Sequence, residues 1–454
     1  MSVDTICALA TAPGGALGII RISGAQALEI LSRIFSKDLS NAQPNTIHYG
    51  HIVEHDAVSQ HHNIIDEALV SVFRAPHSYT GEDSIEISCH GSRYILNKVL
   101  ELLIQQGCRM AEPGEFTKRA YLNGKMDLSQ AEAVADLIAS SNQATHKIAM
   151  SQLRGHFSSQ LAQLREQLLK LTSLLELELD FSDHEDLEFA DRSELKELTK
   201  TINNHITHLA HSFETGKAIK QGIPVAIIGK TNVGKSTLLN RLLHEDRAIV
   251  SDIHGTTRDT IEDTMELQGI TFRFIDTAGI RQTTDEVEQI GIERTYQAIQ
   301  KARIVLWLID KEPSNEEIDK IKQRTENKKL IIVQNKIDKF DNNSYNLLNQ
   351  PTIPISAKFG TGIDTLEQSI YQAADIPTLN DTDVIVTNAR HYDALVRAQQ
   401  SIQRVIDGLE QQLSGDLLSE DLRLALDQLS EITGGQITPN EVLGNIFKNF
   451  CVGK

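Results

Sequence analysis

The residues with the clearest chemistry lie in segment 229–236, which reads Gly-Lys-Thr-Asn-Val-Gly-Lys-Ser. This spacing is typical of a loop that binds phosphate groups, provided that a strand precedes it and a helix follows. Residues 224–228 form a short apolar run, as in a buried strand, and residues 237–243 have a helical pattern. The glycines let backbone N–H groups approach phosphate oxygens at a helix N-terminus, where the partial positive charge favours an anion.

Within this loop we expect Lys235 to contact the β- and γ-phosphates of a nucleotide and the Ser236 hydroxyl to bind Mg²⁺. The predicted contact residues of the loop are Asn232, Val233, Gly234, Lys235, Ser236 and Thr237. A simple glycine turn between a strand and a helix is the alternative interpretation. The segments that follow along the chain favour the nucleotide site.

Three later segments each come directly after an apolar strand pattern. They are Asp276-Thr277-Ala278-Gly279, Asn335-Lys336-Ile337-Asp338 and Ser356-Ala357-Lys358. The first would hold Mg²⁺ through water with its aspartate and bring a glycine amide near the γ-phosphate, and the last would cover the base. The Asp338 carboxylate can accept hydrogen bonds from guanine N1–H and its exocyclic amine, a pair of donors that adenine lacks. An adenine would leave buried polar groups unpaired. The series therefore predicts a GTP-binding domain.

Composition and charge exclude several classes of protein. The length of 454 residues indicates about three domains of ~150 residues, and the formal net charge is −18. Because proteins that coat nucleic acid are usually basic, any contact with RNA must use a local patch or a partner. The start of the chain lacks the basic region of a signal peptide, and no apolar run of about 18 residues could span a membrane. The four cysteines, without metal or redox spacing, fit a reducing compartment; they are Cys7, Cys89, Cys108 and Cys451. We expect a cytoplasmic protein without a membrane segment.

The patterns along the chain predict four regions and a mixed fold. Strand patterns at 64–73 and 84–89 and a helical pattern at 94–106 indicate an N-terminal α+β domain. Later, strands alternate with helices, as in a mostly parallel sheet covered on both faces. Helical patterns flank that region on both sides, which predicts a helical domain interrupted by an inserted nucleotide-binding α/β domain. The predicted regions are residues 1–119, 120–216, 217–377 and 378–454.

Apolar residues at spacings of three and four predict one face of a long helix in the second region. They are Leu153, Phe157, Leu161, Leu164, Leu168, Leu171 and Leu175. The acidic run 183–186 would end this helix, either as a solvated loop or as a cation site. Segment 438–441 reads Thr-Pro-Asn-Glu, which predicts the start of a last helix.

Further motifs resemble the MnmE (also called TrmE) family of tRNA-modification GTPases, and the resemblance covers the whole chain. In the N-terminal region these are Asp4-Thr5-Ile6, Gly18-Ile19-Ile20-Arg21-Ile22-Ser23-Gly24, Ser78-Tyr79-Thr80-Gly81-Glu82-Asp83, Pro113-Gly114-Glu115-Phe116 and Leu122-Asn123-Gly124-Lys125. Later in the chain they are Gly255-Thr256-Thr257-Arg258-Asp259, Leu429-Ser430-Glu431-Ile432-Thr433-Gly434 and the tail Cys451-Val452-Gly453-Lys454. The family more often has isoleucine at the position of Val452.

The resemblance implies an N-terminal α/β dimerisation domain and a helical domain with an inserted Ras-like P-loop domain. It also implies a potassium-dependent GTPase that forms a homodimer, with its GTP domains pairing, and a heterotetramer with the flavoprotein MnmG. Together the two proteins would add an aminomethyl or carboxymethylaminomethyl group at carbon 5 of the wobble uridine of certain tRNAs. The implied cofactors are GTP, Mg²⁺, K⁺ and a tetrahydrofolate derivative of the 5-formyl or methylene type, with FAD only through the partner.

The hydrolytic residues differ from those of Ras-type enzymes, which place a water-orienting glutamine after the Asp-x-x-Gly turn. Here that position is Ile280, which cannot orient water. The resemblance assigns this role to Glu288, for which a solvent-facing glutamate is the alternative. It implies potassium ligands at Asn232, Ser251, Ile253 and Thr256 and a second Mg²⁺ hydroxyl at Thr257. The switch segment expected to contact GTP is Ser251, Asp252, Ile253, His254, Gly255, Thr256 and Thr257.

A folate site is also implied by the resemblance, at Arg21, Glu86, Lys125 and Lys454. Cations suit the carboxylates of folate, and a carboxylate suits the donors on its pterin ring. Without the family, each residue would be interpreted as part of an ordinary surface ion pair. Cys451 is a candidate reactive thiol, and a packed, inert cysteine is the alternative.

Two other classes of GTPase share the nucleotide motifs. A ribosome-assembly GTPase of the Era or Der type should carry a basic RNA-binding domain, which the acidic composition and the Cys-Val-Gly-Lys tail argue against. A GTPase that only organises a partner on a nucleotide cue is the other alternative. Loss of a wobble-uridine modification in a knockout would separate both from the favoured interpretation.

Overall fold

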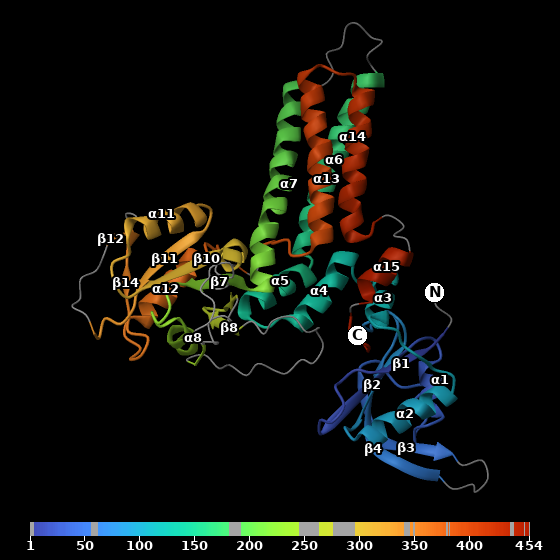
Figure 1. Cartoon of the computed structure of the whole chain (residues 1–454). Helices are drawn as coiled ribbons and strands as arrows, with labels where there is room; N and C mark the ends of the chain where they lie inside the picture. Colours follow the sequence, from blue (N-terminus) through green and yellow to red (C-terminus); the bar gives the residue numbers. More distant parts are fainter. Residues whose placement is uncertain are drawn as a thin grey trace. The chain divides into compact units, whose positions relative to one another are not determined.

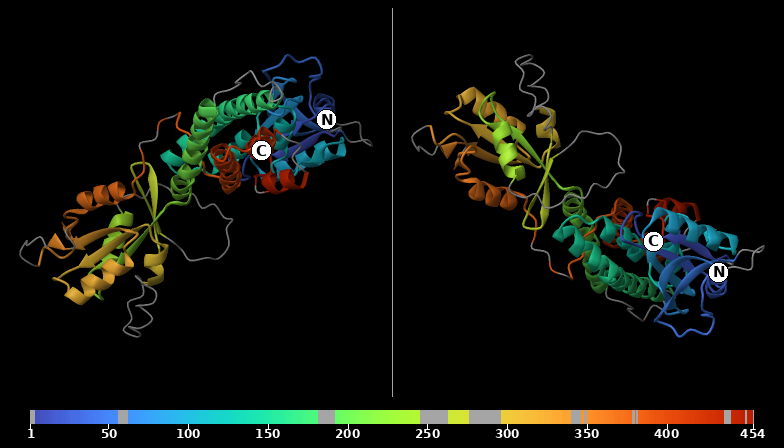
Figure 2. Two further views of the ribbon diagram at one scale, coloured as in Figure 1. Left: turned by 90° about the horizontal axis from the view of Figure 1, so that it is seen from above. Right: turned by 90° about the horizontal axis from the view of Figure 1, so that it is seen from below.

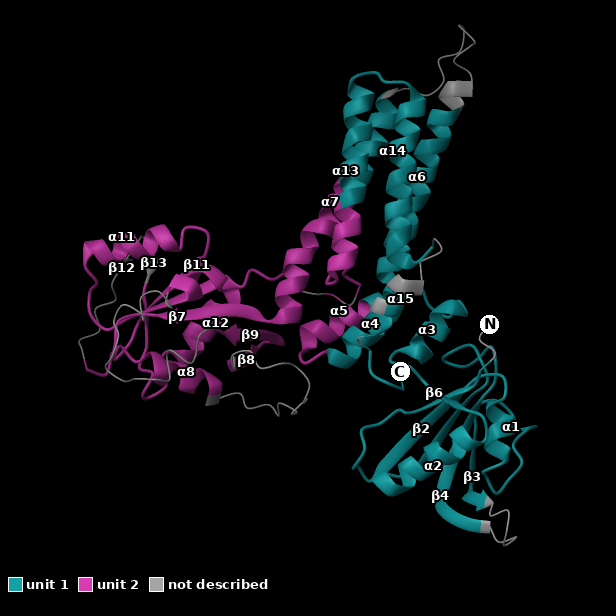
Figure 3. Ribbon diagram, turned by 45° about the vertical axis from the view of Figure 1, so that its right-hand side comes forward, with its two compact units in different colours: residues 1–139, 152–203, 397–454 teal, residues 140–151, 204–396 magenta. Residues whose placement is uncertain are grey.

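The computed structural model divides into two compact units, which Figure 3 shows in two colours. Unit 1 comprises residues 1–139, 152–203 and 397–454, and unit 2 comprises residues 140–151 and 204–396. The residues that the structure describes are 4–55, 62–180, 192–244, 263–275, 296–339, 346–347, 350–377, 380, 382–435, 440–448 and 450–453. The four-region division expected from the sequence stays a prediction.

Unit 1 contains a six-stranded sheet in the order β3-β4-β5-β2-β1-β6. Neighbouring strands are antiparallel except for β1 and β6, which are parallel. The strands are β1 (Ile6–Leu9), β2 (Leu17–Ser23), β3 (Thr46–His55), β4 (His62–Phe73), β5 (Ser84–His90) and β6 (Arg109–Met110). The strands predicted at 64–73 and 84–89 are therefore confirmed.

One face of this sheet packs on α1 (Ala27–Ser32) and α2 (Arg93–Gln105), as Figure 1 shows. Helix α2 buries Leu96, Val99 and Leu103, at spacings of three and four that put them on one side of the helix. The alternating burial along β5 sends every second side chain to the opposite face. That face carries Arg21 and Glu86, which are direct cross-strand partners on β2 and β5.

The helical part of unit 1 begins after the sheet. Its helices are α3 (Glu115–Leu122), α4 (Leu128–Ala139), α6 (His156–Asp180), the first part of α7 (Arg192–Gln221), the second part of α13 (Ala389–Glu410), α14 (Gly415–Thr433) and α15 (Asn440–Phe447). Figure 1 shows α6, α13 and α14 running side by side. Polar pairs join α13 to α14, with Arg404 bound to Asp421 and Ser401 to Gln428.

The predicted long helix in this region needs one correction. Helix α5 (Gln143–Leu153) ends at the first residue of the predicted apolar face, and α6 starts afresh at His156. Gly155 between them has a φ of 83°, a left-handed conformation that interrupts a helix. The other predicted positions, from Phe157 to Leu175, are buried on α6. The acidic run 183–186 lies outside the described residues.

Unit 2 is built on a second six-stranded sheet, in the order β14-β11-β10-β7-β9-β8. All neighbouring strands are parallel except the edge pair β8 and β9. The strands are β7 (Ile223–Ile228), β8 (Asp263–Leu267), β9 (Ile270–Phe274), β10 (Ile304–Ile309), β11 (Lys329–Gln334) and β14 (Ile353–Pro354), with a separate hairpin of β12 (Asn346–Leu347) and β13 (Gln350–Pro351).

Helices cover both faces of this sheet, which explains why every residue of β10 is buried. On one face α8 (Lys235–His244) and α12 (Ile363–Ala373) pack against Leu306 and the residues that alternate with it. On the other face the helical residues 296–301 and α11 (Asn315–Arg324) pack against Trp307 and its alternating neighbours. Figure 2 shows helices along both faces from two further directions. The predicted α/β fold of this region is confirmed.

The chain enters and leaves the α/β part of unit 2 through helices. The last part of α7 packs on the start of α13, where Phe213 stacks on Tyr392 with ring centroids 4.4 Å apart. The Ser212 hydroxyl accepts a hydrogen bond from the Val386 backbone N–H. Among the described residues, no helix has the length and apolar composition needed to cross a membrane.

A buried arginine ties the end of the unit 1 sheet to α3. Arg119 is 4% exposed, and its guanidinium binds Asp4, Glu82 and Glu115 at 2.9, 3.1 and 3.1 Å. Burial would raise the pKa of the Glu115 carboxyl, but hydrogen bonds from Arg109, the Glu112 backbone N–H and Arg119 outweigh it, so the pKa is lowered. The network is complete only while this carboxyl is ionised.

We therefore predict that Arg119→Met destabilises unit 1 by about 3 kcal/mol at pH 7, because it removes a buried guanidinium that binds three carboxylates, two of them largely buried. Folding lowers the pKa of Glu115, so its stabilising contribution is present above the unfolded value of about 4.3 and is lost as the pH falls through the lowered folded value. Calorimetric melting of the full chain between pH 7 and pH 3 measures both effects.

The matched control is Arg33→Met, since Arg33 pairs with Glu29 on the exposed surface of α1. Such a pair contributes at most about 1 kcal/mol. Equal melting shifts for the two variants would contradict the role given to Arg119.

Candidate functional site

The predicted phosphate loop joins β7 directly to α8. Three of its residues have positive φ angles: Gly229 at 148°, Asn232 at 62° and Gly234 at 102°. A Cβ at Gly229 would lie 2.4 Å from the backbone oxygen of Leu308 on β10, so only glycine fits there. Asparagine is among the few other residues that tolerate the left-handed conformation. The residue types of the motif are thus those that this tight loop needs.

Lys235, the first residue of α8, folds back over the loop. Its Nζ donates hydrogen bonds to the backbone oxygens of Gly229 and Lys230, both at 2.7 Å. Burial lowers the pKa of this ammonium. Ser236 and Thr237 follow in the first turn of α8, where the helix dipole favours an anion. The ammonium and the helix end therefore bring positive potential to the loop.

Asn335 connects the phosphate loop to the predicted base-binding segments. It follows β11 and is 3% exposed. Its side-chain Nδ2 donates to the Val233 backbone oxygen at 2.8 Å, and its Oδ1 accepts from the Ala357 N–H at 3.0 Å. One buried side chain thus holds three predicted segments of the nucleotide site together.

Lys336 makes a second connection. Its Nζ donates to the Asn232 backbone oxygen at 2.6 Å and to the Asp310 carboxylate at 2.9 Å. Asp310 directly follows β10 and was not among the predicted site residues. The signal that could have found it is an acidic residue at the carboxyl end of a fully buried strand, the edge where ligands of parallel sheets bind.

Asp338 lies at the same edge, beside the loop formed by Ser356, Ala357 and Lys358. The Ser356 hydroxyl donates to Asp338 Oδ1 at 2.7 Å, and this hydrogen bond lowers the pKa of the carboxyl. An ionised carboxylate can accept the paired donors of guanine. The position and ionisation of Asp338 agree with the predicted role of reading the base.

Several predicted residues lie outside the described part of the chain. These are Ser251, Asp252, Ile253, His254, Gly255, Thr256 and Thr257 of the switch segment, Asp276, Thr277, Ala278 and Gly279, and the proposed catalytic Glu288. Of the predicted potassium and magnesium ligands, the structure describes Asn232 and Ser236. Among the described residues, no group of three or more His, Cys, Asp or Glu could hold a metal ion. Of the residues expected to bind Mg²⁺, Ser236 would offer a hydroxyl oxygen, and this ion prefers oxygen ligands.

A second cluster of predicted site residues lies on the sheet of unit 1. The Arg21 guanidinium binds the Glu86 carboxylate through Nε at 3.0 Å and Nη2 at 2.7 Å. Its central carbon lies 5.7 Å from the ring centroids of both Tyr79 and Phe116, within range of cation–π attraction. Its Nη1 donates to the Gly453 backbone oxygen at 3.1 Å, 432 positions away in the sequence. Two aromatic rings and the C-terminal tail thus surround one arginine.

Lys125 belongs to the loop network next to this cluster. Its Nζ donates to the Pro76 backbone oxygen at 2.9 Å, and Asn123 donates to that of Thr80 at 2.8 Å. Both bonds hold the loop that carries Tyr79, whose hydroxyl is also bonded to Thr117. Of the four predicted folate residues, the structure describes Arg21, Glu86 and Lys125, whereas Lys454 lies outside the described residues.

The tail packs against β1 and the start of α3. The Gly114 N–H donates to the Cys451 backbone oxygen at 3.3 Å. Gly453 has a φ of 91°, and a Cβ there would lie 2.4 Å from the backbone oxygen of Leu9. Cys451 is exposed, whereas Cys7, Cys89 and Cys108 are buried. Exposure is one condition for a reactive thiol, and the reactivity itself stays a prediction.

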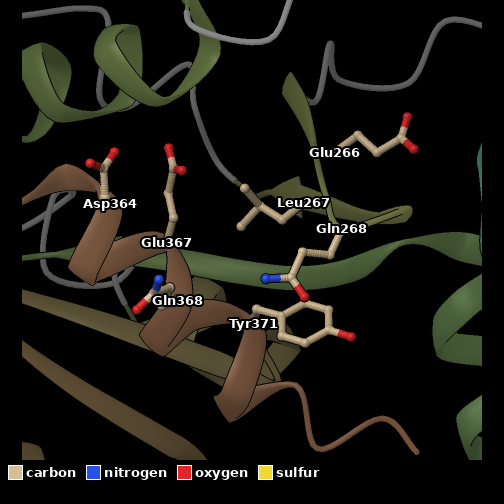
Figure 4. A pocket seen from close by; sticks show the side chains of 7 residues that line it. All are labelled: Glu266, Leu267, Gln268, Asp364, Glu367, Gln368 and Tyr371. Carbon is tan, nitrogen blue, oxygen red and sulfur yellow. The ribbon is translucent and has the colours of Figure 1, made fainter. Parts of the chain in front are cut away.

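A shallow pocket of about 300 Å³ lies between α12 and the turn that joins β8 and β9, as Figure 4 shows. It is lined by Glu266, Leu267, Gln268, Asp364, Glu367, Gln368 and Tyr371. None of these is a predicted nucleotide contact, and three carboxylates would repel phosphate groups. This pocket is therefore a poor candidate for a nucleotide site, and the prediction stays with the phosphate loop.

The phosphate loop follows the central parallel strand β7. The Asn-Lys-x-Asp segment follows β11, two strands away in the sheet, and is bonded to that loop. These two features together define the class of P-loop GTPases. Two family models also match the chain. The one described as "GTP-binding protein TrmE N-terminus" matches residues 5–125, and the one described as "MnmE helical domain" matches residues 128–451.

Similar curated proteins carry the name "tRNA modification GTPase MnmE". The protein of Phocaeicola vulgatus is 55% identical over 494 residues, covering 99% of each chain. That of Bacteroides thetaiotaomicron is 56% identical over 473 residues, covering 100% of each chain. That of Flavobacterium johnsoniae is 52% identical and covers 99% of each chain.

The chain belongs to the MnmE family, and the resemblance expected from its motifs is confirmed. A local likeness also exists to the solved G domain of the T. maritima FeoB iron transporter, with 23% identity over 34% of this chain and 98% of that one. Its TM-score of 0.25 is too low to add to the assignment.

We predict that Asp338→Asn weakens GDP binding and admits xanthosine diphosphate. An amide presents a donor where guanine needs an acceptor, whereas the 2-oxo group of xanthine can accept that donor. The dissociation constants of both nucleotides, measured by titration calorimetry, should change in opposite directions. Lys339→Ala, the neighbouring exposed position, is the control. Retained preference for GDP in Asp338→Asn would show that another group reads the base.

Proposed function

We propose that this chain is a potassium-dependent GTPase that modifies carbon 5 of the wobble uridine of certain tRNAs together with a flavoprotein partner. The observation that carries the GTPase part is the bonding of Asn335 and Lys336 to the phosphate loop, which joins a guanine-reading segment to a phosphate site. The tRNA part is supported by the names of relatives that match the whole chain.

The phosphate loop supports GTP and Mg²⁺ as ligands. The Lys235 ammonium and the N-terminus of α8 would offset the phosphate charge, and the Ser236 hydroxyl would bind Mg²⁺ with Thr257. Bound Mg²⁺ would neutralise charge on the β- and γ-phosphates. Asp276 and Gly279 would complete the γ-phosphate side, and Ser356, Ala357 and Lys358 would cover the base.

The left-handed turn at Asn232 supports a site for a monovalent cation beside the phosphates. Its backbone oxygen is bound by Lys336, so the residue is held by the rest of the site. The Asn232 side chain would hold K⁺ together with Ser251, Ile253 and Thr256. A bound cation would supply positive charge where negative charge develops during hydrolysis, an effect worth about 3 kcal/mol for a single donor in other enzymes. Ile280 leaves the orientation of water to another residue, which we propose to be Glu288.

The cluster around Arg21 supports a second site, for a one-carbon tetrahydrofolate derivative. Arg21 and Lys125 would bind its carboxylates together with Lys454, and Glu86 would accept hydrogen bonds from the pterin ring. Tyr79 is 38% exposed beside Arg21 and offers an aromatic surface to a flat ligand. Cys451, exposed on the tail that Arg21 binds, is the candidate reactive thiol.

The proposed assembly is a homodimer whose GTP domains pair during hydrolysis and which forms a heterotetramer with MnmG. FAD would enter only with this partner, and the complex would act on tRNA in the cytoplasm. With a net charge of −18, the chain offers little general attraction for tRNA, so the partner or a local basic patch must supply it.

We predict that Glu288→Ala lowers the rate of GTP hydrolysis by at least about a hundredfold, since the attacking water loses the group that orients it. The affinity for GTP should stay within about twofold, because the proposed role of this carboxylate is to orient water and not to bind the nucleotide. Stopped-flow binding and single-turnover hydrolysis measure the two quantities separately. Glu286→Ala, two residues earlier, is the control, and unchanged turnover in Glu288→Ala would exclude the assignment.

The tRNA role is tested in a strain that lacks the gene for this chain. Mass spectrometry of tRNA nucleosides should show an unmodified wobble uridine that the wild-type chain restores and Glu288→Ala does not. Normal nucleosides in the knockout would contradict the modification role and favour a ribosome-assembly or organising GTPase.

A further inference from the structure

Arg241 connects the helix of the phosphate loop to the loop that covers the base. It lies on α8, the helix that begins with Lys235. Its Nη2 donates to the backbone oxygen of Lys358 at 2.8 Å, and its Nε lies 3.3 Å from that of Ala357. Arg241 is absent from the four nucleotide motifs, so no motif assigns it a role.

The base loop, residues 356–361, uses other backbone groups for its internal hydrogen bonds. The Ser356 N–H donates to the Thr361 backbone oxygen at 2.9 Å, and the Gly360 N–H donates to that of Ser356 at 2.8 Å. The loop therefore closes on itself through the backbone of its first and last residues. The oxygens of Ala357 and Lys358, two of the four residues between Ser356 and Thr361, are the acceptors that Arg241 reaches from α8.

An arginine suits this contact better than other side chains. Its guanidinium is planar, always charged and carries several donors in a fixed arrangement, so it can hold two successive backbone oxygens at once. Hydrogen bonds from a charged donor are stronger than those between neutral groups. Arg241 is half-buried, and its contact with the Ala357 oxygen is the more shielded of the two from water.

The same loop carries the contacts that place the base-reading groups. The Ser356 hydroxyl orients Asp338, and the Ala357 N–H is bonded to Asn335. A loop that is free to open would lose both contacts. Arg241 therefore acts through the loop and does not need to touch the nucleotide.

We propose that Arg241 is a positioning residue that holds residues 356–358 closed over the guanine and thereby sets the rate of nucleotide release. This inference rests on the proposed GTP-binding function. The two ends of the nucleotide should respond differently to the loss of Arg241. Contacts between the base and residues 356–358 weaken, whereas the contacts of Lys235 and the phosphate loop are unchanged.

The test measures release of a fluorescent GDP analogue from the full-length protein after addition of excess GDP. Arg241→Ala should release the analogue about tenfold faster than the wild type, the factor expected for one charge-assisted hydrogen bond. Arg241→Lys keeps the charge but reaches one oxygen, so release should be about threefold faster. The control is Asn240→Ala, an exposed neighbour on the same helix, which should release at the wild-type rate.

A second readout separates positioning from general damage. The rate of a single GTP turnover at saturating protein should differ by less than about twofold between Arg241→Ala and the wild type, because the phosphate end is intact. Melting of the nucleotide-free variants, followed by the fluorescence of Trp307 on β10, should coincide with that of the wild type.

Faster release with unchanged single turnover and a graded lysine variant would support the proposal. Wild-type release rates in both Arg241 variants would overturn it, and so would a slower single turnover without faster release. A wild-type protein that fails to bind the GDP analogue would instead refute the proposed GTPase function, which this inference presupposes.

Discussion

The nucleotide site depends on the direction of the peptide groups in the phosphate loop. The backbone oxygens of Asn232 and Val233 are bound by Lys336 and Asn335. Because a trans peptide points its N–H away from its C=O, these two bonds turn the N–H groups of Val233 and Gly234 to the other side of the loop. Positive φ angles at Asn232 and Gly234 make this arrangement possible. The base-reading segment thus contributes two hydrogen bonds that shape the phosphate loop.

Much of unit 2 could be predicted, because each nucleotide motif follows a strand whose apolar run is clear in the sequence. The strand expected at 224–228 is found as β7, and the strands expected before the segments at 276 and 335 are found as β9 and β11. Contacts between distant segments could not be predicted. Neither Asp310 nor Arg241 belongs to a motif. Their roles follow only from the folded structure, in which Asp310 contacts Lys336 and Arg241 contacts the base loop.

In unit 1 the motifs identified the family, but they did not explain why these residue types stand at these positions. The structure supplies that reason, since Tyr79 and Phe116 flank Arg21, Arg119 binds Glu82, and Gly453 passes where no Cβ fits. Periodicity alone missed the end of α5, because a single left-handed glycine breaks a helix without altering the apolar spacing around it. The assignments of Glu288, Lys454 and the switch segment concern residues outside the described part of the chain and stay predictions.

We propose that the phosphate loop, through Asn232, recruits a monovalent cation in place of the glutamine and arginine of Ras-type hydrolysis. Steady-state GTP hydrolysis by the purified chain in matched potassium and sodium chloride tests it most directly, with dimerisation followed by light scattering under a transition-state mimic. The claim predicts strong stimulation and pairing of GTP domains in potassium alone, and loss of both in Asn232→Ala. Equal, slow rates in the two salts would contradict it.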